Sequence, residues 1–221
     1  TITTQGDILY RDGSGLARLG AGTSGQVLTT GGSGANPSWA TVSSEMVKIA
    51  EAQVTSSTGS INLDVSFDDT TYMYYKILAT VKFSTGSRVH GRIRQSGTTK
   101  TDSSYRYVMN YAYRQIGSSS NNSYGGTQDA DYFSLSDWKT ESADDFAHFE
   151  LAFGNFMQNT GGHKPIMYSY SSAKHTSGYY PSQETGMVYY IGNNNPITGF
   201  HLYPESGNFT LADLKCYGFK R

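Results

Sequence analysis

Apolar and polar residues alternate along two neighbouring stretches of the chain. Every second residue from Ile61 to Phe67 is apolar, and the same period runs from Tyr72 to Phe83. A period of two places successive side chains on opposite faces of a β-strand, so each stretch predicts a half-buried strand. The polar residues 68–71 predict a turn between them, and we expect the two strands to pair with each other.

Shorter stretches of the same character follow, separated by Gly, Asn, Ser and Pro, at residues 88–94, 105–114, 187–191, 200–203 and 214–219. Several short strands with such turn residues between them are typical of a β-sandwich or jelly roll. The composition agrees, because 18 tyrosines and 10 phenylalanines suit pleated strands and 25 glycines suit tight turns. The predicted fold class is all-β, with an antiparallel β-sandwich of jelly-roll-like type over residues 45–221.

One aromatic segment fits two patterns. The phenylalanines between residues 146 and 156 have the spacing of a helix, whereas Phe149, Leu151 and Phe153 alternate as in a strand. Gly154 and the β-rich context favour a strand. A short helix that caps the sandwich is the alternative.

Residues 1–44 differ from the rest of the chain, since they are rich in Gly, Ser and Thr and contain few large apolar side chains. Such a segment buries too little apolar surface to offset its chain entropy. We expect an extended stalk or attachment segment that is either disordered or ordered by another chain. Its main apolar side chains include Leu9, Tyr10, Leu19, Val27, Leu28 and Trp39.

Charge and cysteine content exclude several classes of protein. A formal net charge of -1 provides no dense cationic surface for bulk nucleic acid or an anionic membrane. No apolar run approaches the roughly 20 residues that span a bilayer, and the first residues do not read as a signal peptide. We therefore expect a soluble protein without membrane insertion. The single cysteine excludes an internal disulfide.

Sequence motifs for catalysis or cofactor binding are weak. Residues 20–25 match the glycine pattern G-x-G-x-x-G, but they lack the flanking strand and helix that a dinucleotide site needs. No nucleophile elbow occurs. Cys216 shares a strand face with Leu214 and is expected to be a buried small hydrophobe. The aspartate pairs at 68–69 and 144–145 are interpreted as turn residues.

The five histidines show no close metal-ligand spacing. His148 and Glu150 share a predicted strand face and are the first pair to examine for a metal site, and the structural alternative is a solvated outer face. We expect no enzyme activity, no cofactor and no metal.

A row of basic residues is the first of two features that indicate binding. We name it the basic stripe; it consists of Arg88, His90, Arg92 and Arg94, which alternate along one predicted strand. Such a stripe can hold phosphate or carboxylate groups of a surface polysaccharide. A solvated face or an ion-pair ladder between subunits is the structural alternative.

Two polar segments rich in tyrosine are the second feature. Residues 118–131 and 168–180 have the composition of binding loops, in which tyrosine offers rigid contact area and Ser, Asn and Gly offer adaptable hydrogen bonds. The tyrosines can instead pack under their own loops. The candidate contacts with a glycan or receptor are Tyr124, Tyr168, Tyr170, Tyr179 and Tyr180.

The N-terminal segment contains a distinctive series of short motifs, in the order Gly6-Asp7-Ile8-Leu9-Tyr10, Leu16-Ala17-Arg18-Leu19, Gly25-Gln26-Val27-Leu28 and Trp39. This series resembles a repeat of bacteriophage tail fibres and related virion appendages. The resemblance implies an attachment or stalk segment wound together with other subunits. It also implies a homotrimer in which the apolar side chains of residues 1–44 are buried.

The remainder of the chain has a Tyr-rich strand at residues 72–83 and ends with Ser206-Gly207-Asn208-Phe209 and then Cys216-Tyr217-Gly218. In these features it is similar to the β-sandwich domains that follow the repeat in phage virion proteins. Cys216 stands where those domains commonly have leucine.

Together the two resemblances imply a non-enzymatic virion protein, a trimeric tail fibre or receptor-binding protein in the phage tail or another surface appendage. Residues 1–44 would dock on other phage tail or capsid proteins, and loops of the sandwich would recognise a host cell-surface polysaccharide. No nucleic acid partner is expected. The first alternative is a capsid decoration or tail-adaptor protein that binds no host molecule, and the second is a glycan depolymerase.

Overall fold

The chain forms two compact units, Thr1–Glu45 and Met46–Arg221. We call them the N-terminal unit and the sandwich. The computed structural model describes residues 2–42, 44–113, 121–136, 146–154, 164–176, 178–193 and 195–221. Within these ranges, side chains are not described at residues 111, 113, 121–125, 127–129, 173–176 and 178–182.

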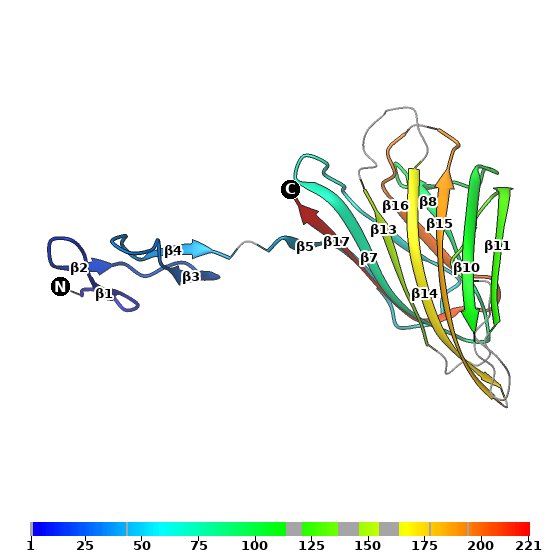
Figure 1. Cartoon of the computed structure of the whole chain (residues 1–221), viewed down its shortest axis with the longest axis horizontal. Helices are drawn as coiled ribbons and strands as arrows, with labels where there is room; N and C mark the ends of the chain where they lie inside the picture. The colour runs from blue at the N-terminus through cyan, green and yellow to red at the C-terminus, as the bar shows by residue number, and fades with distance from the viewer. Residues whose placement is uncertain are drawn as a thin grey trace. The chain divides into compact units, whose positions relative to one another are not determined.

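The larger sheet of the sandwich contains eight antiparallel strands among the described residues (Figure 1). Their order across the sheet is β11 (Asn121–Ala130), β10 (Tyr105–Tyr113), β15 (Gly178–Tyr190), β14 (Lys164–Thr176), β13 (Phe146–Phe153), β7 (Tyr72–Phe83), β17 (Phe209–Lys220) and β5 (Met46–Val54). The last strand, β17, pairs with β7 on one side and β5 on the other. β17 therefore connects β5 to the rest of the larger sheet.

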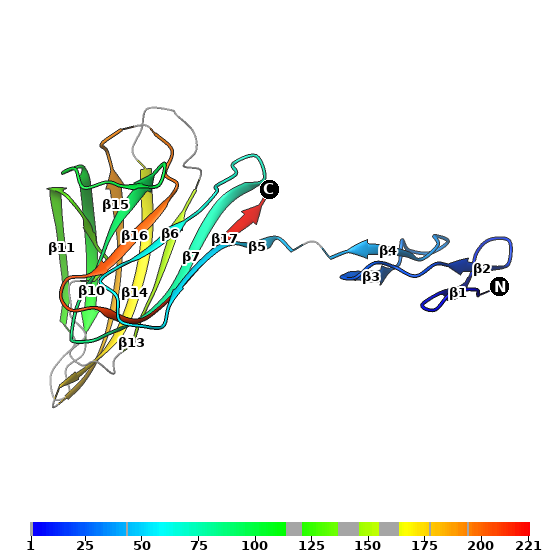
Figure 2. The ribbon, with the colours of Figure 1, turned by 180° about the vertical axis from the view of Figure 1, so that it is seen from behind.

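A smaller sheet lies behind the larger one in the view of Figure 1 and comes forward in Figure 2. In the part of the chain that the structure describes, it consists of β12 (Phe133–Ser134), β8 (Val89–Gln95), β16 (Gly199–Pro204) and β6 (Ile61–Asp64), with β9 (Thr98–Thr99) paired to β8. The described residues contain no helix. The predicted all-β class and its antiparallel sheets are confirmed.

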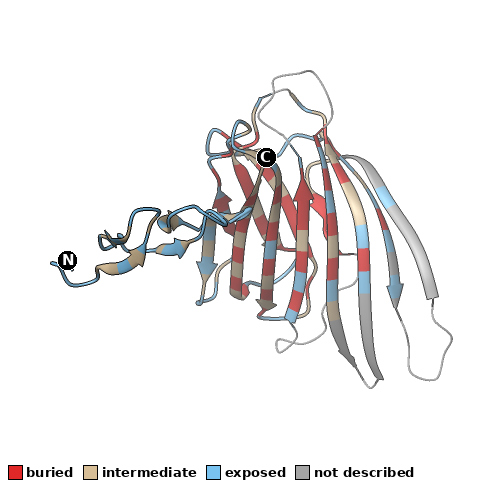
Figure 3. Ribbon diagram, turned by 60° about the vertical axis from the view of Figure 1, so that its left-hand side comes forward, coloured by how far each residue is buried: buried red, intermediate tan, exposed pale blue. Residues whose placement is uncertain are grey.

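One hydrophobic core fills the space between the inner faces of the two sheets. Buried and exposed residues alternate along the strands, as the banding in Figure 3 shows. The largest fully buried side chains include Tyr75, Tyr105, Tyr190, Phe153, Phe200 and Phe209. Aromatic side chains thus supply much of the apolar area that stabilises the sandwich.

The ambiguous aromatic segment is a strand. β13 runs from Phe146 to Phe153, with Phe149 and Phe153 buried and Phe146 exposed. The preference for a strand is confirmed, and the helical alternative is wrong for these residues. Phe156 lies outside the described residues.

The expected pairing of the first two predicted strands is wrong. β6 pairs with β16 in the smaller sheet, whereas β7 pairs with β13 and β17 in the larger one. Residues 65–71 therefore cross from one sheet to the other. Val65 and Phe67 stay buried on this crossing although they lie beyond the end of β6. Alternation predicted which side chains face the core. It does not show which sheet a strand joins, because strands of both sheets turn their apolar face toward the same core.

Several core tyrosines also tie loops to the sheets through their hydroxyl groups. The hydroxyl of Tyr105 donates to the carbonyl of Lys100 at 2.9 Å and accepts from the amide of Ile93 at 3.0 Å. The hydroxyl of Tyr190 donates to a carboxylate oxygen of Asp102 at 3.1 Å. In these two tyrosines the ring packs in the core while the hydroxyl forms hydrogen bonds with polar groups of a loop or strand. Tyrosine can therefore be buried here without leaving its hydroxyl unpaired.

The described part of the N-terminal unit contains two hairpins, β1 (Ile8–Arg11) with β2 (Leu16–Leu19) and β3 (Gln26–Thr29) with β4 (Ser38–Thr41). An ion pair of 2.7 Å joins Arg18 to Asp7, and the indole of Trp39 donates to the carbonyl of Gly20 at 2.6 Å. None of the described residues in this unit is buried. The unit is held by backbone pairing and polar contacts without a core of its own.

Candidate functional site

The arginines of the basic stripe are paired with carboxylates of the same chain. Arg88 lies 3.1 Å from Glu205, and Arg92 lies 2.5 Å from Asp131. The guanidinium of Arg92 also lies over the ring of Tyr203, 4.8 Å from its centroid. An incoming phosphate or carboxylate would have to displace these partners.

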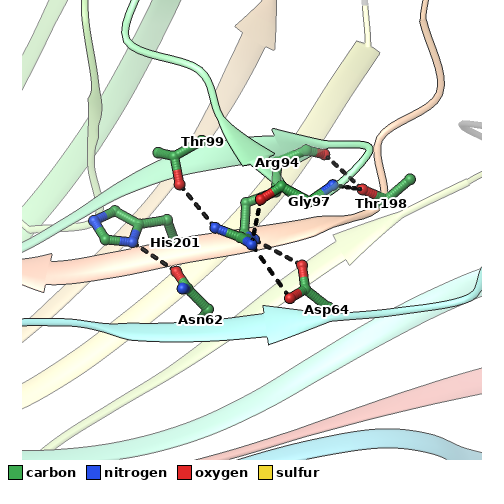
Figure 4. Close-up of polar contacts among 7 residues, drawn as sticks. All are labelled: Asn62, Asp64, Arg94, Gly97, Thr99, Thr198 and His201. Carbon is green, nitrogen blue, oxygen red and sulfur yellow. Dashed lines mark hydrogen bonds and ion pairs between the residues drawn. The ribbon is translucent and has the colours of Figure 1, made fainter.

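Arg94 forms hydrogen bonds with several neighbouring segments of the smaller sheet (Figure 4). Its guanidinium donates to a carboxylate oxygen of Asp64 at 2.7 Å, to the hydroxyl of Thr99 at 2.9 Å and to the carbonyl of Gly97 at 2.5 Å. These contacts link β8 to β6, to β9 and to the turn between β8 and β9. Arg94 therefore holds the smaller sheet together, and its side chain is only 11% exposed.

His90 does not extend the positive charge of the stripe, which corrects the sequence interpretation. It is 7% exposed, stacks on Tyr132 with ring centroids 4.2 Å apart and meets Tyr203 edge-on at 5.6 Å. Burial lowers the pKa of His90 to about 4. The imidazole is therefore neutral near pH 7 and serves as an aromatic packing element.

The two tyrosine-rich segments form strands where loops were expected. Residues 121–130 form β11, and residues 164–176 and 178–190 form the paired strands β14 and β15. Residues 118–120 and 177 of the two segments lie outside the described residues. Tyr168 and Tyr170 face the core at 4% and 1% exposure, so their rings are not available to a receptor. Tyr124, Tyr179 and Tyr180 lie in strands, and their side chains are outside the described residues.

The predicted attachment residues of the N-terminal unit remain accessible to a partner. Leu9, Val27 and Leu28 are each between 44% and 48% exposed. Tyr10, Leu19 and Trp39 are only partly covered. These side chains therefore remain at least partly open to solvent on both hairpins.

The outer face of the larger sheet is hollowed over its central strands, and this is the feature that sequence reasoning missed. A pocket of about 520 Å³ lies across β17, β7, β13, β14 and β15. Ser169 and Ser171 line it. These serines alternate with the buried Tyr168 and Tyr170 along β14, so the two-residue period of this segment was the available signal.

His148 and Glu150 share the outward face of β13, as the sequence predicted, and both line this pocket. His148 Nδ1 and the hydroxyl of Thr80 form a hydrogen bond of 2.9 Å across β13 and β7. Glu150 forms an ion pair of 2.8 Å with Lys76. Within the described residues, no group of three or more His, Cys, Asp or Glu is placed to hold a metal ion.

Asp68 acts as a turn residue, in line with its sequence interpretation. Its carboxylate accepts hydrogen bonds from the hydroxyl of Thr70 at 2.6 Å and from the amide of the same residue at 2.9 Å. These bonds, with a further contribution from Thr71, lower the pKa of Asp68 to about 2. The aspartates at 144–145 lie outside the described residues.

Cys216 is fully buried, as predicted, and burial raises the pKa of its thiol to about 12. Only the thiolate attacks a disulfide reagent, so native Cys216 is expected to react at least about a thousandfold more slowly than an exposed thiol. The measurement is the rate of labelling by an aromatic disulfide at pH 8, with the guanidinium-unfolded chain as the control. As the chain has one cysteine, the signal has a single source. Rapid labelling of the native protein would contradict this expectation.

None of the described segments forms a helix with the length and apolarity that crossing a bilayer requires.

Comparison with protein-family models, with curated proteins and with solved structures finds no match to this chain. Functional inference therefore depends on the geometry above and on the sequence motifs.

Proposed function

We propose that this protein is a non-enzymatic attachment protein of a phage virion, a tail fibre or receptor-binding protein that acts as a homotrimer. In this proposal the N-terminal unit docks on other tail or capsid proteins, and the sandwich binds a polysaccharide of the host cell surface. Several copies on one particle would turn weak individual contacts into tight attachment.

The observation that carries the proposal is the contrast between the two units. The sandwich buries a large aromatic core, whereas no described residue of the N-terminal unit is buried. Leu9, Val27 and Leu28 lie on hairpins too small to fold stably alone. Such a segment gains its order from other chains, which is what the motif series of residues 1–44 implies through its resemblance to tail-fibre repeats.

The two-unit organisation leads to a direct test by light scattering. We expect the full chain to have three times its 24.2 kDa mass and a variant without residues 1–44 to be a monomer that keeps the strand signal of the sandwich in circular dichroism. The reason is that the apolar side chains of the N-terminal unit lie on two small hairpins without a buried residue among those described, so they need another subunit to cover them, whereas the sandwich has a core of its own. A truncated chain that unfolds would contradict the division into two units.

Two further outcomes would change the proposal. If the truncated chain stayed a trimer, the sandwich itself would form the subunit interface. A well-behaved monomer of the full chain would favour the capsid decoration protein, whose N-terminal unit is ordered only by the particle on which it sits.

A further inference from the structure

We propose that the pocket on the outer face of the larger sheet binds a neutral oligosaccharide. This inference deepens the proposed function, on which it rests, by naming the binding site and the chemical class of its ligand. In this inference the sugar binds neither to the basic stripe nor to the rings of the tyrosines named as candidate contacts in the sequence analysis.

The shape of the pocket suits an extended chain that crosses the strands. Paired residues form one continuous row over five neighbouring strands, in the order Asp213, Thr80, His148, Ser171 and Gln183. All five line the pocket. With about 4.8 Å between neighbouring strands, this row is about 19 Å long. The volume of about 520 Å³ is within the usual range for small-molecule sites.

The carboxylates and the lysine in the pocket have partners of opposite sign, which excludes a strongly charged ligand. Asp213 pairs with Lys215 at 2.7 Å, and Glu150 pairs with Lys76 at 2.8 Å. The hydrogen bond that the ammonium of Lys76 donates to Glu150 raises the pKa of Lys76, so this ammonium stays charged near neutral pH. An anionic sugar would meet a carboxylate beside each ammonium group, whereas a neutral hydroxyl can bond to either.

The remaining surface of the pocket offers both hydrogen-bonding groups and apolar area. Ser169, Ser171 and Gln183 can each donate and accept hydrogen bonds, as a sugar hydroxyl does. Leu78 is 40% exposed, and Tyr217, which also lines the pocket from β17, is partly exposed. A sugar ring has an apolar face and a polar rim and therefore matches this mixture of side chains.

A peptide is a poorer match because the pocket lies in the middle of the sheet. The backbone groups of β7, β13 and β14 are already paired with neighbouring strands on both sides. Peptide segments that bind sheets add to an open edge, where unpaired backbone groups remain. Only side chains are available in this pocket, and most of them are polar.

The test uses the full chain and two panels of oligosaccharides. The neutral panel has three to five glucose, galactose, mannose or N-acetylglucosamine units. The anionic panel has sialylated or hexuronate-containing oligosaccharides of equal length. Binding is followed by saturation-transfer NMR and titration. Ser171→Trp puts an indole into the pocket from an exposed position and is expected to raise the Kd for the neutral sugars at least about tenfold.

Met167→Trp is the matched control, because Met167 lies on the same strand and the same outward face but outside the pocket. We expect it to change the Kd by less than about twofold. Glu150→Gln is a second variant of nearly unchanged size. It leaves Lys76 without its carboxylate partner, and we expect weaker binding of neutral sugars and stronger binding of anionic ones.

Four results would overturn the inference. Neutral sugars that bind equally well to Ser171→Trp would place the site elsewhere, and binding of anionic sugars alone would contradict the ligand class. Loss of self-association in Ser171→Trp would make this face an interface between copies of the chain. The inference would also be rejected if none of the neutral oligosaccharides tested binds to the full chain. The mass measurement of the full and truncated chains needs no sugar, so failure of the proposed attachment function is seen separately.

Discussion

Phe153→Ala is expected to lower the free energy of unfolding of the sandwich by about 3–5 kcal/mol. Phe153 is 2% exposed at the end of β13. The centroid of its ring lies 5.7 Å from the ring centroid of Tyr75 in the larger sheet and 5.4 Å from that of Phe200 in the smaller one. The ring also packs edge-on against Phe67, with the centroids 5.6 Å apart. The substitution leaves a cavity where the two sheets meet, and such a loss is a large fraction of the stability of an ordinary domain.

The measurement is urea unfolding followed by tyrosine fluorescence and circular dichroism. Phe146→Ala is the matched control, since Phe146 lies on the same strand but is 44% exposed. Its ring contacts are with His148 at 6.4 Å and with the ammonium of Lys82 at 5.5 Å. We expect this variant to lose about 1 kcal/mol or less. Equal losses from the two substitutions would show that Phe153 does not join the sheets.

Acidification from pH 6.5 to pH 4 is expected to destabilise the sandwich through His90 by up to about 3 kcal/mol. Burial lowers the pKa of His90 to about 4 from its ordinary value of 6.5, and the nearby guanidinium groups of Arg88 and Arg92 act in the same direction. The carboxylates of Glu205 and Asp131 oppose this shift. In this pH range the unfolded chain binds a proton that the folded chain excludes, so stability falls as the pH falls and this contribution is absent above pH 7.

His90→Phe tests this expectation, because phenylalanine can stack on Tyr132 but binds no proton. The free energy of unfolding is measured at half-unit steps from pH 4 to pH 8. The variant should show a smaller slope between pH 4 and pH 6.5 and the parental slope above pH 7. His201 contributes in the same direction, since burial and Arg92 and Arg94 lower its pKa, so part of the slope should remain. An unchanged slope in the variant would contradict the role of His90.

Side-chain alternation allowed the class of the fold and several buried positions to be predicted from the sequence. The predicted strand at 72–83 has the bounds of β7, and the preference for a strand at Phe146 to Phe153 is confirmed in β13. Cys216 is buried as its alternation with Leu214 indicated. These predictions succeeded because a strand places successive side chains on opposite faces, so a local pattern is enough to show which residues avoid water.

The candidate site was predicted less well, because tyrosine and histidine are compatible with either side of a sheet. Tyr168 and Tyr170 are buried, while the serines between them line the pocket. His90 is a neutral packing residue beneath Tyr132, although its place in the sequence put it among cations. The recognition surface that composition predicts stays a prediction, and composition does not show which residues of an alternating pair face outward.

By itself the sequence determined the all-β class, the strand character of the aromatic segments and the scarcity of apolar residues at 1–44, since each depends only on neighbouring residues along the chain. The tertiary structure decided that β6 and β7 belong to different sheets and that each stripe arginine meets a carboxylate from a distant segment. It also decided that Asp213, Thr80, His148, Ser171 and Gln183 form one row. Strand partners are selected by packing between residues far apart in the chain, and a local period of two carries no information about that choice.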